Sequence, residues 1–175
     1  MTAIIDSYVI QHGTLSKYLS EQGEISLKID ADRRFTKVLV LACASYFEDE
    51  IVRKIESYVR DVTCNNETVV SLLKKKALSR QYHTLFDWDR KNANRFFSYF
   101  GDESKDKHSK DLKEVDGLNI QEANFMFLGG LRNTLVHTNF AIASIDETYE
   151  EIYQKYLSAH KFLDYIAKHL NDLSS

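Results

Sequence analysis

Three polar side chains that could act on a phosphodiester lie in residues 131–137, a segment that is otherwise largely apolar and helical in pattern. They are Arg132, Asn133 and His137. The arginine guanidinium offers a rigid fork of donors for phosphate oxygens, and histidine is the side chain best suited to carry protons near neutral pH. The asparagine amide can orient a hydroxyl group or an imidazole. Together these groups could cleave RNA without a metal ion.

The spacing of these residues decides whether they can meet. On a helix, Asn133 and His137 share a face, whereas Arg132 lies about 140° around the axis from His137. One straight helix therefore does not bring the three groups together, and a site shared between two chains fits them better. Gly129 and Gly130 come just before them, and we expect their lack of side chains to let another backbone approach.

A spacing of three to four residues between apolar positions predicts helices along most of the chain. The expected helices cover residues 2–22, 30–63, 67–79, 91–100, 119–140 and 152–173. The second would be roughly 50 Å long. Its residues 38–44 are apolar on every side, which predicts burial under neighbouring elements or against a second copy.

Two segments show no such spacing. Residues 81–89 are irregular, and residues 102–116 are charged and nearly without large apolar side chains, which favours a solvated loop with room for a short helix. No segment has a convincing strand pattern. We therefore expect a single all-α domain, residues 1–175, built as a bundle of about five or six helices.

Local signals predict where the helices begin and end. Gly23 is a plausible stop for the first helix. Asp30 or Asp32 could form the N-cap of the second helix. Asn119 and Glu122 have the spacing of a capping box at the start of a later helix.

The composition is that of an ordinary globular protein, with 43% hydrophobic residues, 28% charged residues and a net charge of -3. This charge excludes a chain that is basic all over, so any contact with RNA must come from a local patch. Cys43 and Cys64 fit no metal or redox spacing, which favours a reduced, cytoplasmic setting. The first residues lack the pattern of a signal peptide. Residues 38–47, the most apolar run, are far short of the ~18 residues that suggest a membrane span, so we expect no contact with a membrane.

Each candidate side chain also has a purely structural explanation. Arg132 could pair with an acidic residue, and His137 could cap the C-terminal end of its helix. Polar groups in an apolar setting favour a functional site but do not prove one. Glu48, beside an apolar stretch, is a candidate partner of Arg132 or of Arg53.

Three other groups of residues carry weaker signals. Two basic groups could follow a phosphate backbone, although a charge run is more often a solvated helix face; they comprise Lys74, Lys75, Lys76 and Arg80, and Arg90, Lys91 and Arg95. Four rings could stack on bases, although packing explains them more simply; they are Tyr82, His83, Phe86 and Trp88. The metal-binding types His160, Asp164 and His169 lie on the last helix, but no Cys or Glu completes a ligand set, so we expect neither metal nor cofactor.

The order Arg132-Asn133-x-x-x-His137 resembles the R-x(4–6)-H signature of the HEPN superfamily, in which Asn commonly follows the Arg. The motif lies on a late helix, after a long amphipathic helix and before one last helix. Residues 35–48 also resemble the early helix of the RiboL-PSP type of HEPN domain, through Phe35, Val38, Leu39, Tyr46, Phe47 and Glu48. The resemblance covers residues 33–170.

This resemblance implies a HEPN-like all-α helical bundle that forms a homodimer. It also implies metal-independent endoribonuclease activity in a prokaryotic toxin–antitoxin or phage-defence system. It places Arg132, Asn133 and His137 on the family's catalytic positions. In the implied reaction a ribose 2′-OH attacks its adjacent phosphorus; His137 would move the proton, Arg132 would neutralise the developing charge, and Asn133 would orient His137 or the phosphate. Some HEPN toxins have a Tyr, modified by a partner nucleotidyltransferase, where this chain has Asn139, so that mode of inhibition is not expected.

A restraining partner, such as an antitoxin or a sensor, is expected from the resemblance alone. Two alternatives stay open. The first is a non-catalytic module of the same fold that binds RNA, a nucleotide or another protein. The second is a helical interaction protein in which Arg132 and His137 have only structural roles.

Overall fold

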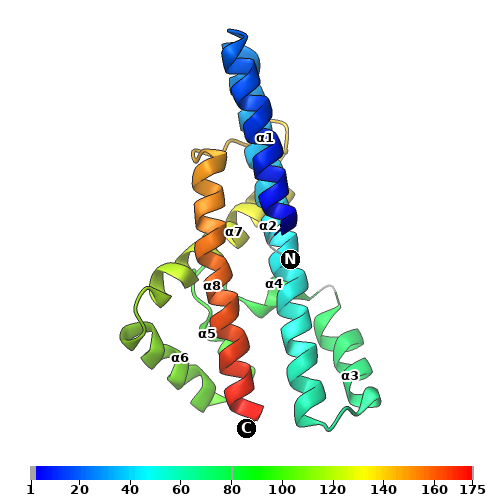
Figure 1. Ribbon diagram of the computed structural model, residues 1–175. Helices are drawn as coiled ribbons and strands as arrows, with labels where there is room; N and C mark the ends of the chain where they lie inside the picture. The colour runs from blue at the N-terminus through cyan, green and yellow to red at the C-terminus, as the bar shows by residue number, and fades with distance from the viewer. Residues whose placement is uncertain (1–2, 80, 175) are drawn as a thin grey trace.

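The computed structural model describes residues 3–79 and 81–174, most of which are helical (Figure 1). Four long helices form the frame: α1 (Ala3–Glu21), α2 (Ile25–Val62), α7 (Leu118–His137) and α8 (Tyr149–Ser174). The shorter elements between α2 and α7 are α3 (Glu67–Leu73), the π-helical turn η1 (Lys74–Leu78), α4 (Tyr82–Leu85), α5 (Asn94–Ser98) and α6 (Asp102–Glu114). The described residues contain no strand, so the predicted all-α fold is confirmed, with eight α-helices rather than five or six. None of these helices is both long enough and apolar enough to cross a membrane.

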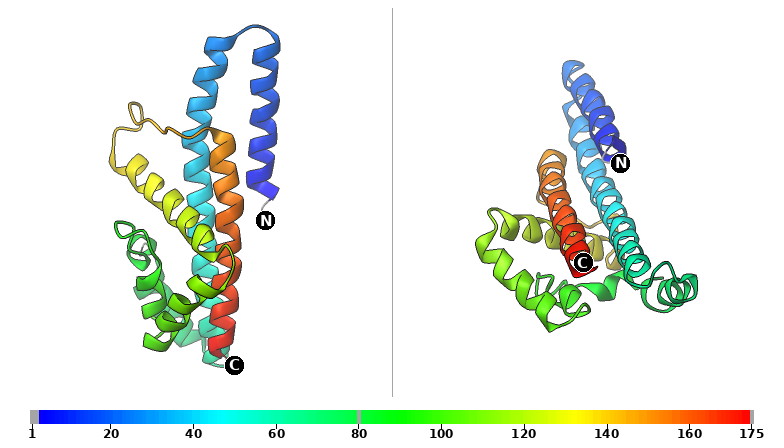
Figure 2. Two further views of the ribbon diagram at one scale, coloured as in Figure 1. Left: turned by 90° about the vertical axis from the view of Figure 1, so that its left-hand side faces the viewer. Right: turned by 60° about the horizontal axis from the view of Figure 1, so that its bottom comes forward.

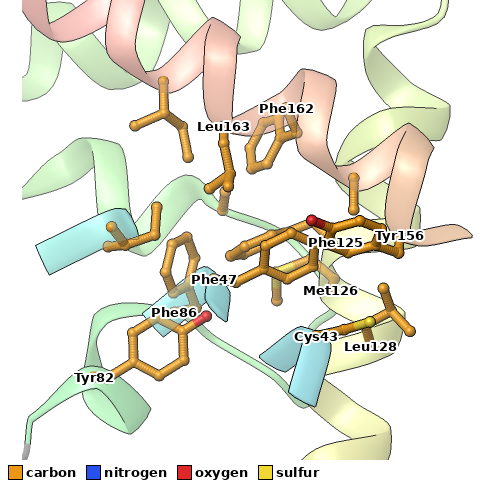
Figure 3. Packing of buried hydrophobic residues seen from close by; sticks show 14 of the residues in the cluster. Cys43, Phe47, Tyr82, Phe86, Phe125, Met126, Leu128, Tyr156, Phe162 and Leu163 are labelled. Atoms are coloured by element: carbon orange, nitrogen blue, oxygen red, sulfur yellow. The ribbon is translucent and has the colours of Figure 1, made fainter. Parts of the chain in front are cut away.

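The core is aromatic and lies where α2, α7 and α8 meet (Figure 3). The ring of Phe47 on α2 lies 5.4 Å, centroid to centroid, from both Phe125 of α7 and Tyr156 of α8. Phe86 and Phe162 pack on Phe125 from two other sides. All five rings are almost fully buried, and each removes about 150–250 Å² of surface from water. This core holds α7, which carries the candidate residues, against α2 and α8.

α1 runs antiparallel to the first part of α2, and the turn between them lies beyond the rest of the molecule (Figure 2). Gly23 in this turn has a φ of +76°, a left-handed conformation that glycine adopts without strain. The predicted stop of the first helix is therefore confirmed, whereas its predicted start at Thr2 lies outside the described residues. The beginning of α8 covers one side of the hairpin, where the hydroxyl of Tyr153 donates to Asp6 Oδ1 at 2.9 Å.

α2 begins at Ile25, more than one turn before the predicted start, so neither Asp30 nor Asp32 is its N-cap. Asp32 instead joins α1 to α2: its carboxylate accepts from His12 at 2.8 Å and from Lys28 at 2.7 Å. Burial alone would raise the pKa of Asp32, but these hydrogen bonds outweigh it and lower the pKa. The carboxylate is therefore used as a tertiary contact rather than as a cap.

Residues 102–116 are not a loop: most of them form α6, so that prediction was wrong. α6 lacks an apolar stripe because it docks mainly through polar side chains. Ser104 Oγ lies 2.8 Å from His169 Nε2 of α8, and the ring of His108 stacks on Phe97 with centroids 3.9 Å apart. Ser104, His108 and His169 are all buried, so α6 is part of the folded domain.

The predicted capping box at the start of α7 is also absent, because the N-cap is Gly117. Glu122 is instead buried, where it accepts the backbone N–H of Ala93 at 2.5 Å. A reciprocal capping box occurs at the start of α8, between Thr148 and Glu151. At its other end, α7 stops at His137, three residues before the predicted end.

Candidate functional site

Arg132 and Asn133 are half-buried neighbours on α7 and are hydrogen-bonded to each other. Arg132 Nη1 donates to Asn133 Oδ1 at 3.2 Å. Because a guanidinium can only donate, it is the amide oxygen that must face it. This bond occupies one donor of the fork and leaves the others for an oxyanion. Asn133 is thus bonded to Arg132 rather than to His137, which the sequence had suggested as one of its partners.

His137 is exposed and is the last residue of α7. It does not cap the helix: the C-cap is Thr138, whose backbone N–H and hydroxyl both donate to the carbonyl of Thr134. Within residues 3–79 and 81–174, the imidazole takes part in no hydrogen bond or ion pair. An imidazole that faces solvent at a helix end can reach a substrate, as a general acid or base must.

Tyr82, at the start of α4, is buried within electrostatic range of both Arg132 and Glu48. Burial raises the pKa of its phenol, the Glu48 carboxylate raises the pKa further, and Arg132 lowers it. The phenol therefore stays protonated near neutral pH. The predicted ion pair of Glu48 is not found: in the described part of the chain it pairs with neither Arg132 nor Arg53, and Arg53 binds other acids of α2.

The two glycines before Arg132 differ in their surroundings. A Cβ at Gly129 would lie only 2.0 Å from Cζ3 of Trp88, whereas a Cβ at Gly130 would meet nothing within 4 Å. Gly129 is therefore needed for packing within the chain, because the indole of Trp88 lies against the bare backbone of α7. The close approach at Gly129 is made by a side chain of the same chain and not by another backbone, as had been expected, and only Gly130 remains open.

Comparison with known proteins assigns the chain to a family, and the match includes α7. A sequence model of the RiboL-PSP-HEPN family matches residues 12–172, nearly the entire chain. The chain belongs to the RiboL-PSP-HEPN family. Searches of curated proteins and of solved structures gave no match. HEPN domains include ribonucleases and nucleotide-binding modules. Membership of the family is therefore compatible with either function and does not distinguish between them.

The aromatic group of this HEPN domain belongs mostly to the core. Tyr82 and Phe86 are buried (Figure 3), and Trp88 is half-buried, with its indole N–H bonded to the carbonyl of His83 at 3.0 Å. Packing therefore accounts for Tyr82 and Phe86, which are not available to stack on bases. The His83 ring is exposed.

The two basic groups are partly neutralised. Lys74 lies 2.9 Å from Glu56, and Arg90 lies 3.5 Å from Asp87. Arg80 lies outside the described residues. The other members are exposed and could still contact phosphates; they are Lys75, Lys76, Lys91 and Arg95.

The three residues considered as metal ligands do not converge. His160 Nδ1 lies 3.7 Å from Asp164 Oδ2, and its Nε2 lies 3.0 Å from the hydroxyl of Tyr46. His169 is buried at a different place on α8 and is bonded to Ser104. No group of three or more metal-binding side chains occurs among residues 3–79 and 81–174.

Proposed function

We propose that this HEPN domain is a metal-independent endoribonuclease. The observation that carries the proposal is on α7: a half-buried guanidinium, held by Asn133, lies near the end of the helix where His137 is exposed and unbonded. Membership of a family in which ribonucleases occur supports the same chemistry. The arrangement supplies a proton carrier and an anion binder, which are the two groups that cleavage by an internal hydroxyl needs.

The reaction follows from these groups. An imidazole takes the proton of a ribose 2′-OH while that oxygen attacks the adjacent phosphorus. The new O–P bond closes a cyclic phosphate, the bond to the 5′-oxygen breaks, and a protonated imidazole returns a proton to that leaving oxygen. Arg132 stabilises the extra negative charge of the phosphorane through its remaining donors. Asn133 keeps the guanidinium in place by accepting its Nη1–H.

The proposed site is shared by two copies of the chain. Arg132 and His137 lie about 140° apart around α7, and no hydrogen bond in the described chain joins them. In a symmetric dimer the guanidinium of one chain can face the imidazole of the other, and two imidazoles supply both a base and an acid. Exposed apolar side chains around His137 fit burial in such a contact; they are Val136, Phe140 and Ile142.

We further propose that the nuclease acts in the cytoplasm as the effector of a toxin–antitoxin or phage-defence system, with a partner protein that restrains it. An unrestrained ribonuclease damages its own host. The proposal requires RNA as substrate and makes no use of a cofactor or a membrane.

The test is incubation of the purified protein with single-stranded RNA and with DNA of the same sequence, with and without EDTA. We expect RNA to be cut in both conditions, with cyclic phosphate and 5′-hydroxyl ends, and DNA to remain intact because it lacks the 2′-OH. His137→Ala should lower the rate by about 10²–10⁴-fold, and Arg132→Lys by about 10²-fold or more. His83→Ala is the matched control, since His83 is also exposed, and it should cut at the wild-type rate.

Cleavage that stops in EDTA would contradict the mechanism, as would equal rates for His137→Ala and wild type. Binding of RNA with no cleavage in any condition would favour the non-catalytic module instead.

A further inference from the structure

The hairpin of α1 and the first part of α2, residues 3–38, leaves much of its apolar surface uncovered. We call this hairpin the arm. Four side chains of α1 follow one face in steps of four, seven and three residues; they are Ile4, Tyr8, Leu15 and Tyr18. The face that α1 turns toward α2 and α8 carries the buried Ile5, His12 and Ser16. α2 and α8 therefore cover only part of the apolar surface of α1.

α2 continues this uncovered surface. Leu27 and Val38 are eleven residues apart, about three turns, and share a face with Ala42. Ala42 lines a cavity of about 620 Å³ together with Ile4 and Tyr8 of α1, so the uncovered faces of both helices meet on one side of the arm. We call the six side chains the arm stripe: Ile4, Tyr8, Leu15, Tyr18, Leu27 and Val38.

Further along the chain, the same face of α2 is covered. Lys74 and Leu78 of η1 line the far end of the cavity, and Lys74 forms an ion pair with Glu56 of α2 at 2.9 Å. Away from the turn, the opposite side of the arm is covered by α8, through the bond from Tyr153 to Asp6 and the edge contact of Tyr149 with His12. The part of the arm that projects in Figure 2 has no other element of the described chain beside it, and Ile10, Ile25 and Ile29, outside the stripe, are exposed as well.

We propose that the arm stripe is a self-association surface, on which the arm of a second copy packs to form a four-helix bundle. Its area fits this role. The six residues are 44–58% exposed, and at roughly 200 Å² for a fully exposed large side chain they present roughly 600 Å². A standard interface buries roughly 800 Å² per partner, of which somewhat over half is apolar.

The charge of the arm also fits a second copy. Residues 3–38 contain five acidic and five basic residues, so their net charge is zero. Several of them are already paired within the arm, such as Lys28 with Asp32 and Arg34 with Asp30. Two copies therefore meet without repulsion, whereas RNA or an anionic membrane would require a basic surface. A neutral apolar stripe is complementary to itself, as a twofold contact demands.

The arm stripe is inferred to hold together the same homodimer that forms the proposed shared site. To that extent, this inference rests on the proposed function. The test measures molar mass by light scattering between 1 and 100 µM, a range on the order of typical weak to moderate affinities. Wild type should approach twice 20.3 kDa. The double variant Leu15→Glu/Leu27→Glu should remain at 20.3 kDa, with its dissociation constant raised at least about 100-fold.

The matched control is Val69→Glu/Leu72→Glu on α3, which places the same two charges at exposed apolar positions off the arm. It should dimerise like wild type, and circular dichroism should show both variants folded. A second measurement needs no charge substitution: Leu15→Cys in a Cys64→Ser background should be joined to a second chain by a short bismaleimide, and Leu72→Cys in that background should not.

A monomeric wild type would overturn the arm proposal, and so would an arm variant that still dimerises or an uncrosslinked Leu15→Cys. A monomeric wild type would also contradict the shared site of the proposed nuclease, whereas an arm variant that still dimerises would leave that site untouched. A dimer that depends on the arm but never cuts RNA would leave the arm proposal standing and contradict the proposed nuclease.

Discussion

Replacing Gly129 with alanine tests how α7 is seated beside the candidate site. An ideal Cβ at Gly129 would lie 2.0 Å from Cζ3, 2.6 Å from Cη2 and 2.7 Å from Cε3 of Trp88. At Gly130, the next residue of the same helix, a Cβ would meet nothing within 4 Å. Gly129→Ala and Gly130→Ala therefore make the same chemical change, with a clash in one case and open space in the other.

These distances determine the expected changes in unfolding free energy. To reach an ordinary contact of about 3.5 Å, the indole must move by roughly 1.5 Å. It is held by the bond from its N–H to the His83 carbonyl and by the Phe86 ring, 5.2 Å away between centroids. Overpacking of this kind costs about 1–3 kcal/mol, while alanine in place of a helical glycine returns about 1 kcal/mol at either position. Gly130→Ala should thus gain about 1 kcal/mol of unfolding free energy, and Gly129→Ala should lie about 1–3 kcal/mol below it.

Urea unfolding followed by fluorescence measures this difference, because Trp88 is the single tryptophan of the chain. In a domain of this size each kcal/mol also shifts the melting temperature by about 2–4 °C. The fluorescence emission of Gly129→Ala should move to longer wavelength because the indole of Trp88 is displaced from its position against α7. The emission of Gly130→Ala should not move. In a Trp88→Leu background, followed by circular dichroism, the two alanine variants should become equally stable. Equal stability and equal emission in the wild-type background would refute the packing of the indole on Gly129.

Two further predictions concern the buried polar contacts. Burial lowers the pKa of His169 to about 4. As the pH falls, the unfolded chain takes up this proton near pH 6.5, whereas the folded chain does not until about pH 4. The unfolding free energy should therefore fall by on the order of 3 kcal/mol as the pH is lowered from 6.5 to 4. Urea titrations should show a flatter pH profile for His169→Gln than for the exposed control His83→Gln, and parallel profiles would exclude the effect. Glu122→Leu should lose about 2–3 kcal/mol because it leaves the Ala93 N–H unpaired, whereas Glu122→Gln keeps an acceptor and should lose less; equal losses would argue against the bond.

The helices that could be predicted from the sequence are those that bury an apolar stripe. α2, α7 and α8 each turn one such stripe to the core, so periodicity alone indicated them. α6 was missed because its buried residues are Ser104 and His108, which look solvated in a sequence. Asp32 was mistaken for a cap because one of its partners, His12, lies on another helix. Both errors have one cause: a polar side chain acquires a buried partner only in the tertiary structure.

The candidate site shows the same limit. Helical spacing placed Asn133 and His137 on one face, but it could not show that the amide oxygen of Asn133 would accept a bond from Arg132. Gly129 was expected to admit another backbone, but the group that approaches it is the indole of Trp88 from a distant segment of the same chain. Spacing along a helix states which side chains can meet, and packing decides which of them do.

The six histidines of the chain show why His137 is the catalytic candidate independently of any motif. Four have partners that hold them: His12 with Asp32, His108 with Tyr165, His160 with Tyr46 and His169 with Ser104. A catalytic imidazole must reach the substrate and change its protonation during turnover, which a buried and bonded ring can do only by leaving its packing. His83 and His137 remain, both exposed and with imidazole rings that make no hydrogen bond in the described chain. Only His137 shares a helix with a guanidinium that still has donors to offer, so an equal loss of RNA cleavage in His83→Ala and His137→Ala would count against the site as a whole.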